Sequence, residues 1–232
     1  MRAYAMDTLN KIGHLRQMKL PKPDFTFDIR AFYRKIVHTL TIWVYRPKYI
    51  GFENIPESGP AILICNHVSY MDGPVIDAGC KRPARYLIDE DIYNAPGVNY
   101  LMKLDRAIPI APNRKSVEKA FDEISDALRN GEMVCIFPEG FLTFTGGLGR
   151  FRPGIEWIIK RDPVPIIPMT ISGLWGSVFS RKYLKSPFRW FPRHWDLNVV
   201  VKCGEPIDPT KERVTVNYLQ KIILKLKYSI ND

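Results

Sequence analysis

Short apolar runs alternate with amphipathic helical patterns from residue 48 onward, and this alternation constrains the fold more than any other feature of the chain. Strands are predicted in the apolar runs at 49–53, 61–65, 84–88, 107–111, 133–137, 164–171 and 197–202. Helices are predicted from periodic apolar positions at 72–80, 97–104, 115–129, 154–161 and 212–229. The pattern at 115–129 is the clearest, because one apolar stripe ends just before Gly131. Strands separated by such helices predict an α/β domain with a mixed, largely parallel sheet flanked by helices.

Another amphipathic helix is predicted before this domain, with Asp28 as its N-cap and Pro47 as its stop. Trp43 and Tyr45 lie near its end. The helix either packs on the core or lies in a membrane interface, with aromatic side chains at headgroup depth and basic residues toward anionic lipid. We therefore divide the chain into a basic leader with this N-terminal amphipathic helix, 1–47, and a main domain, 48–232. No run reaches the roughly 18 apolar residues of a membrane span, so no transmembrane helix is expected.

The stretch ICNHVSYMDGP, residues 64–74, places His67 and Asp72 in a polar break directly after an apolar strand. Asn66 and His67 thus emerge at the carboxyl end of a strand, where open α/β sheets bind their ligands. Side chains five positions apart diverge on a helix and lie on opposite faces of a strand, so these two meet only across a turn. A histidine oriented by a carboxylate is a general-base arrangement. The structural alternative is that Asp72 caps the following helix and His67 is a surface residue.

No protein nucleophile and no metal-ligand set accompanies this pair in the sequence. Cys65 lies in an apolar run that would raise its thiol pKa, Ser69 is too close along the turn, and no G-x-S-x-G elbow is present. The four histidines lack metal-ligand spacing, so no metal and no bound cofactor are predicted. Four scattered cysteines without a C-x-x-C pair favour reduced thiols in a cytosolic compartment. A general base without a nucleophile suggests deprotonation of a substrate hydroxyl.

Two later blocks, VCIFPEG at 134–140 and PVPIIPM at 163–169, follow in order. Together with NHVSYMD they resemble the motif blocks of the glycerophospholipid acyltransferase family, the PlsC-type 1-acylglycerol-3-phosphate acyltransferases and their relatives, over about residues 48–205. The resemblance implies acyl transfer from acyl-CoA or acyl-carrier protein to the free hydroxyl of a lysophospholipid or 1-acylglycerol-3-phosphate. It implies that His67 is the general base and that Asp72 orients it.

The resemblance also implies which residues bind the acceptor: Asn66, Pro138, Glu139 and Gly140. For Glu139, the alternative is a buried helix cap or a structural ion pair. The strings RAIPIAP, FRPGIEWII and GLWGSVFSRK are most similar to lysophospholipid acyltransferase modules that can occur fused to acyl-carrier or acyl-CoA synthetases.

The chain departs from the family pattern where phosphate-binding arginines are usual. The arginine after the second-block strand falls near Pro112, and the usual Thr-Arg after Pro-Glu-Gly is replaced by Phe141-Leu142. These departures favour a lysophospholipid with a larger headgroup. The candidate phosphate ligands are Arg106, Arg114, Arg150 and Arg152. For the last two, a solvated basic loop is the alternative.

The chain carries 34 Lys and Arg against 24 Asp and Glu, a net charge of +10 that suits an anionic partner. The segment 180–195 interleaves basic residues with aromatic ones, of which the expected interface residues are Phe188, Trp190, Phe191 and Trp195. With the helix before residue 47, it predicts peripheral or monotopic attachment to an anionic membrane surface on the cytoplasmic face. Core packing of these aromatics is the alternative.

Two other function classes are compatible with parts of this pattern. Nucleic-acid binding would suit the charge, but no nucleic-acid motif is present, so no nucleic-acid partner is expected. A non-catalytic protein of the same fold that binds membrane lipid is the alternative function.

Overall fold

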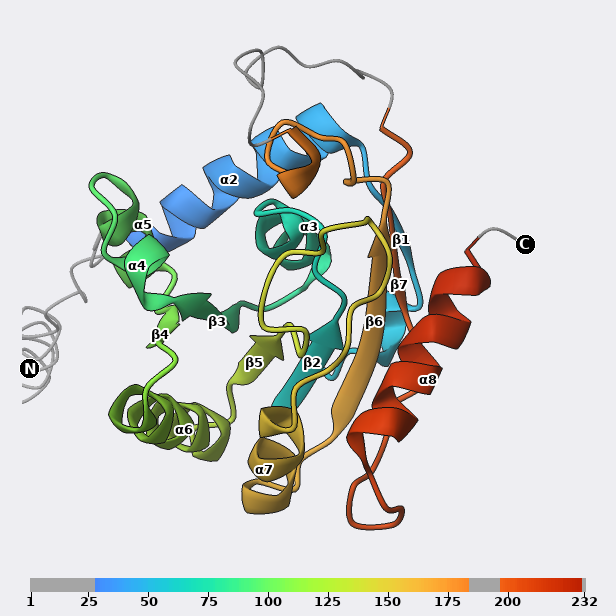
Figure 1. Ribbon diagram of the computed structural model, residues 1–232. Helices are drawn as coiled ribbons and strands as arrows, with labels where there is room; N and C mark the ends of the chain where they lie inside the picture. Colours follow the sequence, from blue (N-terminus) through green and yellow to red (C-terminus); the bar gives the residue numbers. More distant parts are fainter. Residues whose placement is uncertain (1–27, 184–196, 231–232) are drawn as a thin grey trace, which may run out of the picture.

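The computed structural model describes residues 28–183 and 197–230 of the 232-residue chain (Figure 1). Within these residues, seven strands form one sheet in the order β1-β7-β6-β2-β5-β3-β4. Neighbouring strands are parallel, except that β6 and β7 are antiparallel. The predicted mixed, largely parallel sheet is therefore confirmed. The strands are β1 (Lys48–Ile50), β2 (Ala61–Cys65), β3 (Ala84–Asp89), β4 (Ile108–Ile110), β5 (Met133–Ile136), β6 (Ile166–Ser172) and β7 (Val200–Cys203).

Helices cover both faces of the sheet, so the central strand β2 is completely buried and reads as a continuous apolar run. Its residues alternate between two cores. Leu63 and Cys65 join the core that includes α3, while Ile62 and Ile64 join the core that includes α6, α7 and α8. The helices are α2 (Ile29–Tyr45), α3 (Asp72–Gly79), α4 (Glu90–Tyr93), α5 (Val98–Leu104), α6 (Arg114–Arg129), α7 (Gly154–Arg161) and α8 (Val216–Tyr228), with short 3₁₀ turns η1 (Phe52–Asn54) and η2 (Arg181–Tyr183).

Element boundaries follow local chemistry closely. Asp28 caps α2 by accepting from two backbone N–H groups, and α6 ends before Gly131, which has a φ of 75°. The strand predicted at 49–53 is shorter than expected, because Gly51 adopts a φ of 73° and the chain turns into η1. Helix α8 begins later than predicted, because Thr215 caps it by accepting from the amide of Tyr218.

Helix α2 packs on α3 with its polar side (Figure 1). Asp77 of α3 accepts from Arg34 Nε at 2.9 Å and lies 2.7 Å from His38 Nε2. Two residues of α2 are buried, Thr41 and Tyr45. The opposite side carries an exposed row of apolar residues, called the α2 stripe below. It consists of Ile29, Phe32, Ile36, Leu40 and Trp43.

This orientation contradicts the membrane-interface prediction for Tyr45 and is compatible with the one for Trp43. Tyr45 is only 7% exposed and joins the core, so it does not face a lipid surface, whereas Trp43 is 73% exposed. The other predicted interface residues, Phe188, Trp190, Phe191 and Trp195, lie outside the described residues. Among the described helices, none has the length and apolar character needed to cross a membrane.

Strands β6, β2 and β5 are neighbours that run in the same direction. The segments that follow β2 and β5 therefore meet at one edge of the sheet, called the carboxyl edge below. This edge is where a parallel sheet binds ligands, and the residues of the NHVSYMD and Pro-Glu-Gly blocks gather there.

Candidate active site

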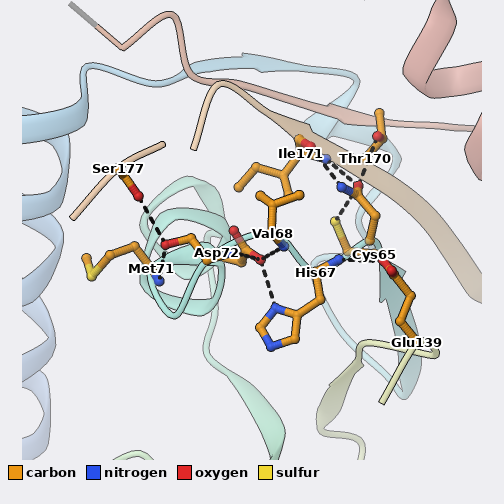
Figure 2. Close-up of polar contacts among 11 residues, drawn as sticks. Cys65, His67, Val68, Met71, Asp72, Glu139, Thr170, Ile171 and Ser177 are labelled. Atoms are coloured by element: carbon orange, nitrogen blue, oxygen red, sulfur yellow. Dashed lines mark hydrogen bonds and ion pairs between the residues drawn. The ribbon is translucent and has the colours of Figure 1, made fainter. Parts of the chain in front are cut away.

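The chain turns directly after β2, and this turn brings the side chains of His67 and Asp72 together (Figure 2). His67 Nδ1 lies 2.8 Å from Asp72 Oδ2. The turn is held by the same carboxylate oxygen, which accepts from the amides of Val68 at 2.6 Å and Ser69 at 3.0 Å. Asp72 is also the first residue of α3. The sequence prediction that a turn would allow this pair to meet is confirmed.

Asp72 is fully buried, so its charge depends on these hydrogen bonds. Burial raises the pKa of the Asp72 carboxyl, and the bonds from His67, Ser69 and Val68 oppose that rise. A carboxylate held by three donors keeps a fixed position. It orients the imidazole and stabilises the positive charge that the ring gains when it accepts a proton.

The His67 ring is held on a second side by Phe137. The two rings are stacked, with centroids 4.1 Å apart and planes 12° from parallel. The His67 side chain is 19% exposed, and among the described residues nothing hydrogen-bonds to its Nε2. Since the Asp72 carboxylate accepts at Nδ1, the proton of a neutral ring resides there and Nε2 keeps its lone pair. The ring can therefore take a proton from a substrate at Nε2.

Glu139 lies opposite His67 on the neighbouring chain segment. The two residues are 72 positions apart, which continues the register of β2 with β5 beyond the strand ends. One carboxylate oxygen accepts from the His67 amide at 2.8 Å, and the other accepts from the Gly149 amide at 2.6 Å. Burial raises the pKa of this carboxyl, and the two amides oppose the rise.

These contacts correct the expectation that Glu139 binds the acceptor. Its side chain is fully buried and both oxygens are engaged by backbone, so it holds the His67 turn against the loop after β5. The alternative considered from the sequence, a buried helix cap or a structural ion pair, is right about the structural role but not about the partners, because the carboxylate accepts from two loop amides. Gly149 is required beside it, since a Cβ there would collide with the carboxylate.

Asn66 has a structural role, since its side chain is fully engaged by the fold. It is fully buried, and its Oδ1 accepts from the Ile171 amide at 2.8 Å and from the Thr170 hydroxyl at 3.0 Å. Its Nδ2 donates to the Ile171 carbonyl at 3.0 Å. The side chain therefore joins the ends of β2 and β6 and satisfies the backbone groups of Ile171.

The loop after β5 carries the remaining residues of the Pro-Glu-Gly block. Pro138 is buried, and its carbonyl accepts from the Arg152 amide at 2.8 Å. Gly140 is exposed with a φ of 71°, and a Cβ there would lie 2.7 Å from Arg152 Nε. The glycine is needed because Arg152 folds across it, donating to the Glu139 carbonyl at 3.3 Å.

Arg150 and Arg152 lie together on a pocket of about 560 Å³. Phe141, the start of α7 and the start of α8 supply its other walls, and His67 is not among its lining residues. The two arginines thus line one pocket, and their proposed role as phosphate ligands stays a prediction.

Arg106 is not brought to this edge of the sheet. It precedes β4 and donates to Glu132, just before β5, at 2.7 Å, so it lies at the opposite edge. Arg114 starts α6 with its side chain 93% exposed and pairs with Glu118 in the same helix. The structure therefore removes Arg106 from the candidate site and gives Arg114 no contact with it.

Among the described residues, no side chain beside His67 is placed to act as a nucleophile, and no group of side chains is arranged to bind a metal ion. Cys65 is buried, and burial raises the pKa of its thiol. Ser69 directs its hydroxyl toward Ser177, 3.4 Å away, and not toward His67. Within residues 28–183 and 197–230, no cluster of His, Cys, Asp and Glu has the arrangement of a metal site.

No role was predicted from the sequence for Phe137 or Gly149, although both shape the site. For Phe137 a signal was available. Pairing β2 with β5 in parallel places the residue before Pro138 beside the end of β2. No sequence signal locates Gly149, because a ten-residue separation from Glu139 does not define how a loop folds back.

Comparison with known proteins identifies the family of the chain. A family model described as Acyltransferase matches residues 46–172. The chloroplastic 1-acyl-sn-glycerol-3-phosphate acyltransferase BAT2 of Brassica napus is 24% identical over 173 residues, which cover 73% of this chain and 48% of the relative. The 1-acyl-sn-glycerol-3-phosphate acyltransferase of Pseudomonas aeruginosa is 26% identical over 153 residues, covering 60% of this chain and 58% of that protein. This chain spans about half the length of its chloroplastic relatives.

The fold resembles that of a solved structure, the 1-acyl-sn-glycerophosphate acyltransferase PlsC from Thermotoga maritima. The two align with a TM-score of 0.66 and 21% identity, over 97% of this chain and 88% of that one. At this identity the match concerns the fold.

Proposed function

Because this chain belongs to the Acyltransferase family, whose model matches more than half of it, we propose that it acylates the free hydroxyl of a 1-acylglycerol-3-phosphate or another lysophospholipid. The acyl donor is a thioester, either acyl-CoA or acyl-carrier protein. The observation that carries the proposal is the 2.8 Å contact between His67 Nδ1 and the buried Asp72, which leaves Nε2 available as a base. The similarity to 1-acyl-sn-glycerol-3-phosphate acyltransferases supports the class of acceptor.

The reaction needs no covalent enzyme intermediate. His67 Nε2 removes the proton of the acceptor hydroxyl as its oxygen attacks the thioester carbonyl carbon. The tetrahedral species collapses, the carbon–sulfur bond breaks, and the thiolate takes the proton from the imidazolium. A thiol is a good leaving group, since its pKa is about 8.5, so little further acid assistance is required. Asp72 stabilises the imidazolium between the two steps.

The lipid acceptor must reach the protein from a membrane, and the α2 stripe supports docking on such a surface. Apolar residues of this row are 43–73% exposed, while the polar side of α2 is used against α3. A helix with this distribution lies flat in an interface. We propose that α2 attaches the domain to an anionic membrane surface, with the net charge of +10 adding electrostatic attraction.

Thiol release tests the reaction directly. Purified protein is mixed with palmitoyl-CoA, or with palmitoyl-acyl-carrier protein, and with lysophosphatidic acid, lysophosphatidylethanolamine or lysophosphatidylglycerol in detergent. We expect release that needs an acceptor, and a roughly 10²–10⁴-fold lower rate for His67→Ala. His38→Gln is the matched control, since that side chain lies on α2 and can still donate to Asp77. Vesicle binding without thiol release from either donor would instead indicate a non-catalytic lipid-binding protein.

A further inference from the structure

Arg181 opens the 3₁₀ turn η2, in the connection between β6 and β7, and its neighbours are fastened to the catalytic turn. Ser69 and Ser180 form an isolated antiparallel bridge, and the Tyr70 amide donates to the Phe179 carbonyl at 3.3 Å. The residues just before Arg181 therefore run beside the segment that carries His67. This placement could not be expected from the sequence, because more than 100 residues separate the two segments.

The side chain of Arg181 reaches from there to the loop after β5. Its Nη1 donates to the Leu142 carbonyl at 3.3 Å, and its guanidinium lies 4.0 Å from the centroid of the Phe144 ring. The intervening residue, Thr143, donates its amide to the His67 carbonyl at 2.9 Å. The guanidinium is thus next to a loop segment that is bonded directly to the histidine.

The charge of Arg181 has no carboxylate partner within ion-pair distance among the described residues. In this it differs from Arg106 and Arg114, which are paired with Glu132 and Glu118. Among the residues that the structure describes, one backbone carbonyl uses one of its five N–H donors, and the guanidinium lies over an aromatic ring that does not neutralise it. A half-buried guanidinium with spare donors is suited to a phosphate group.

We propose that Arg181 binds the phosphate of the acceptor lipid beside the His67 turn. The assignment rests on the proposed acyltransferase reaction and adds a specificity-determining residue to it. The acceptor phosphate is one short glycerol backbone away from the hydroxyl that His67 deprotonates. A cation attached to both the His67 turn and the adjoining loop can therefore hold the headgroup while the hydroxyl meets Nε2.

Calorimetric titration with a short-chain, water-soluble lysophosphatidic acid tests the proposal, with the matching 1-monoacylglycerol as the ligand that lacks phosphate. We expect Arg181→Gln to raise the Kd for the phosphate-bearing ligand about 10- to 100-fold, the range for losing a charge-assisted hydrogen bond. The Kd for monoacylglycerol should not change. The Kd of Arg181→Lys for lysophosphatidic acid should lie between those of the wild type and Arg181→Gln, because an ammonium keeps the charge without the planar fork. Arg129→Gln, at the distant end of α6, is the matched control.

Turnover then separates this proposal from competing explanations. The KM for lysophosphatidic acid should rise with the Kd while kcat changes little and the KM for palmitoyl-CoA is constant. Four results would each overturn the assignment. Arg181→Gln could weaken binding of both acceptors equally, raise only the KM for palmitoyl-CoA, or affect only binding to anionic vesicles. Arg152→Gln could weaken lysophosphatidic acid binding more than Arg181→Gln does. If Arg181→Gln does not fold, the test uses Arg181→Lys. A higher Kd for lysophosphatidic acid alone supports the assignment, and an unchanged Kd overturns it. Wild-type protein that binds the acceptor through Arg181 but releases no thiol would refute the proposed reaction and leave the assignment standing.

Discussion

Replacing Glu139 with glutamine separates a positioning role from substrate binding, because the shape of the side chain is kept. The glutamate accepts from two backbone N–H groups, those of His67 and Gly149, and it is fully buried. Glutamine has one acceptor oxygen, so in either amide orientation one N–H faces an NH₂ group and loses its partner.

The magnitude follows from that lost partner. An unsatisfied buried donor costs about 1–3 kcal/mol of unfolding free energy. Removal of a buried charge offsets part of it, because burial already raises the pKa of this carboxyl and so disfavours its ionised form. We therefore expect a loss of about 1–2 kcal/mol, which lowers the Tm of a domain of this size by roughly 2–8 °C.

The assay pairs thermal unfolding with the thiol-release kinetics. Because the His67 amide loses its anchor, the ring moves relative to the acceptor hydroxyl, and displacements of about 1 Å can cost up to 10²-fold in rate. We expect kcat to fall at least about 10-fold while the KM for lysophosphatidic acid changes less than about 2-fold. Glu205→Gln, a change at an exposed glutamate, should alter neither quantity. An unchanged Tm together with a raised acceptor KM would refute the reasoning, since it would mean that Glu139 contacts the acceptor.

Two further perturbations test the surface of the domain. Leu40→Asp in the α2 stripe should weaken binding to anionic vesicles, measured by sedimentation, by about 10-fold or more, since a leucine buried in the membrane interface contributes roughly 1.5–3 kcal/mol. Leu224→Asp on α8 is the control, and equal losses from the two variants would contradict docking through α2. Burial raises the pKa of Asp105 to about 6, so its contribution to stability is present at acid pH and is lost as pH rises from about 4 to 6. Asp105→Asn should therefore have a higher unfolding free energy than wild type at pH 7.5, and a smaller gain at pH 5. The gain should be about 1 kcal/mol or less because the carboxyl is partly solvated. Denaturant titrations that give the same difference at both pH values would contradict this prediction.

Local features of the chain were predictable to a large extent. The buried strand 61–65 and the amphipathic helix after Asn113 follow from patterns that a few adjacent residues create. The meeting of His67 with Asp72 belongs to the same class, because only a turn separates them and their approach is a local event.

Contacts between distant segments were predicted less well. Glu139 was expected to face the acceptor, but the pairing of β2 with β5 turns its carboxylate toward two backbone amides. Arg106 was a candidate because it flanks the expected arginine position near Pro112, but it lies before β4 and so at the other edge of the sheet. The predicted strand at 107–111 already placed Arg106 at the start of that strand, and its ion pair with Glu132 shows where the side chain lies.

The sequence by itself determined the α/β alternation, the carboxyl-edge position of His67 and its partnership with Asp72. Only the tertiary structure decided that Tyr45 is buried while the α2 stripe is exposed, and that Arg181 reaches the loop beside His67. The physical reason is the range of the interactions. Strand and helix patterns arise from neighbouring residues, whereas burial and charge pairing depend on groups that folding brings from elsewhere in the chain.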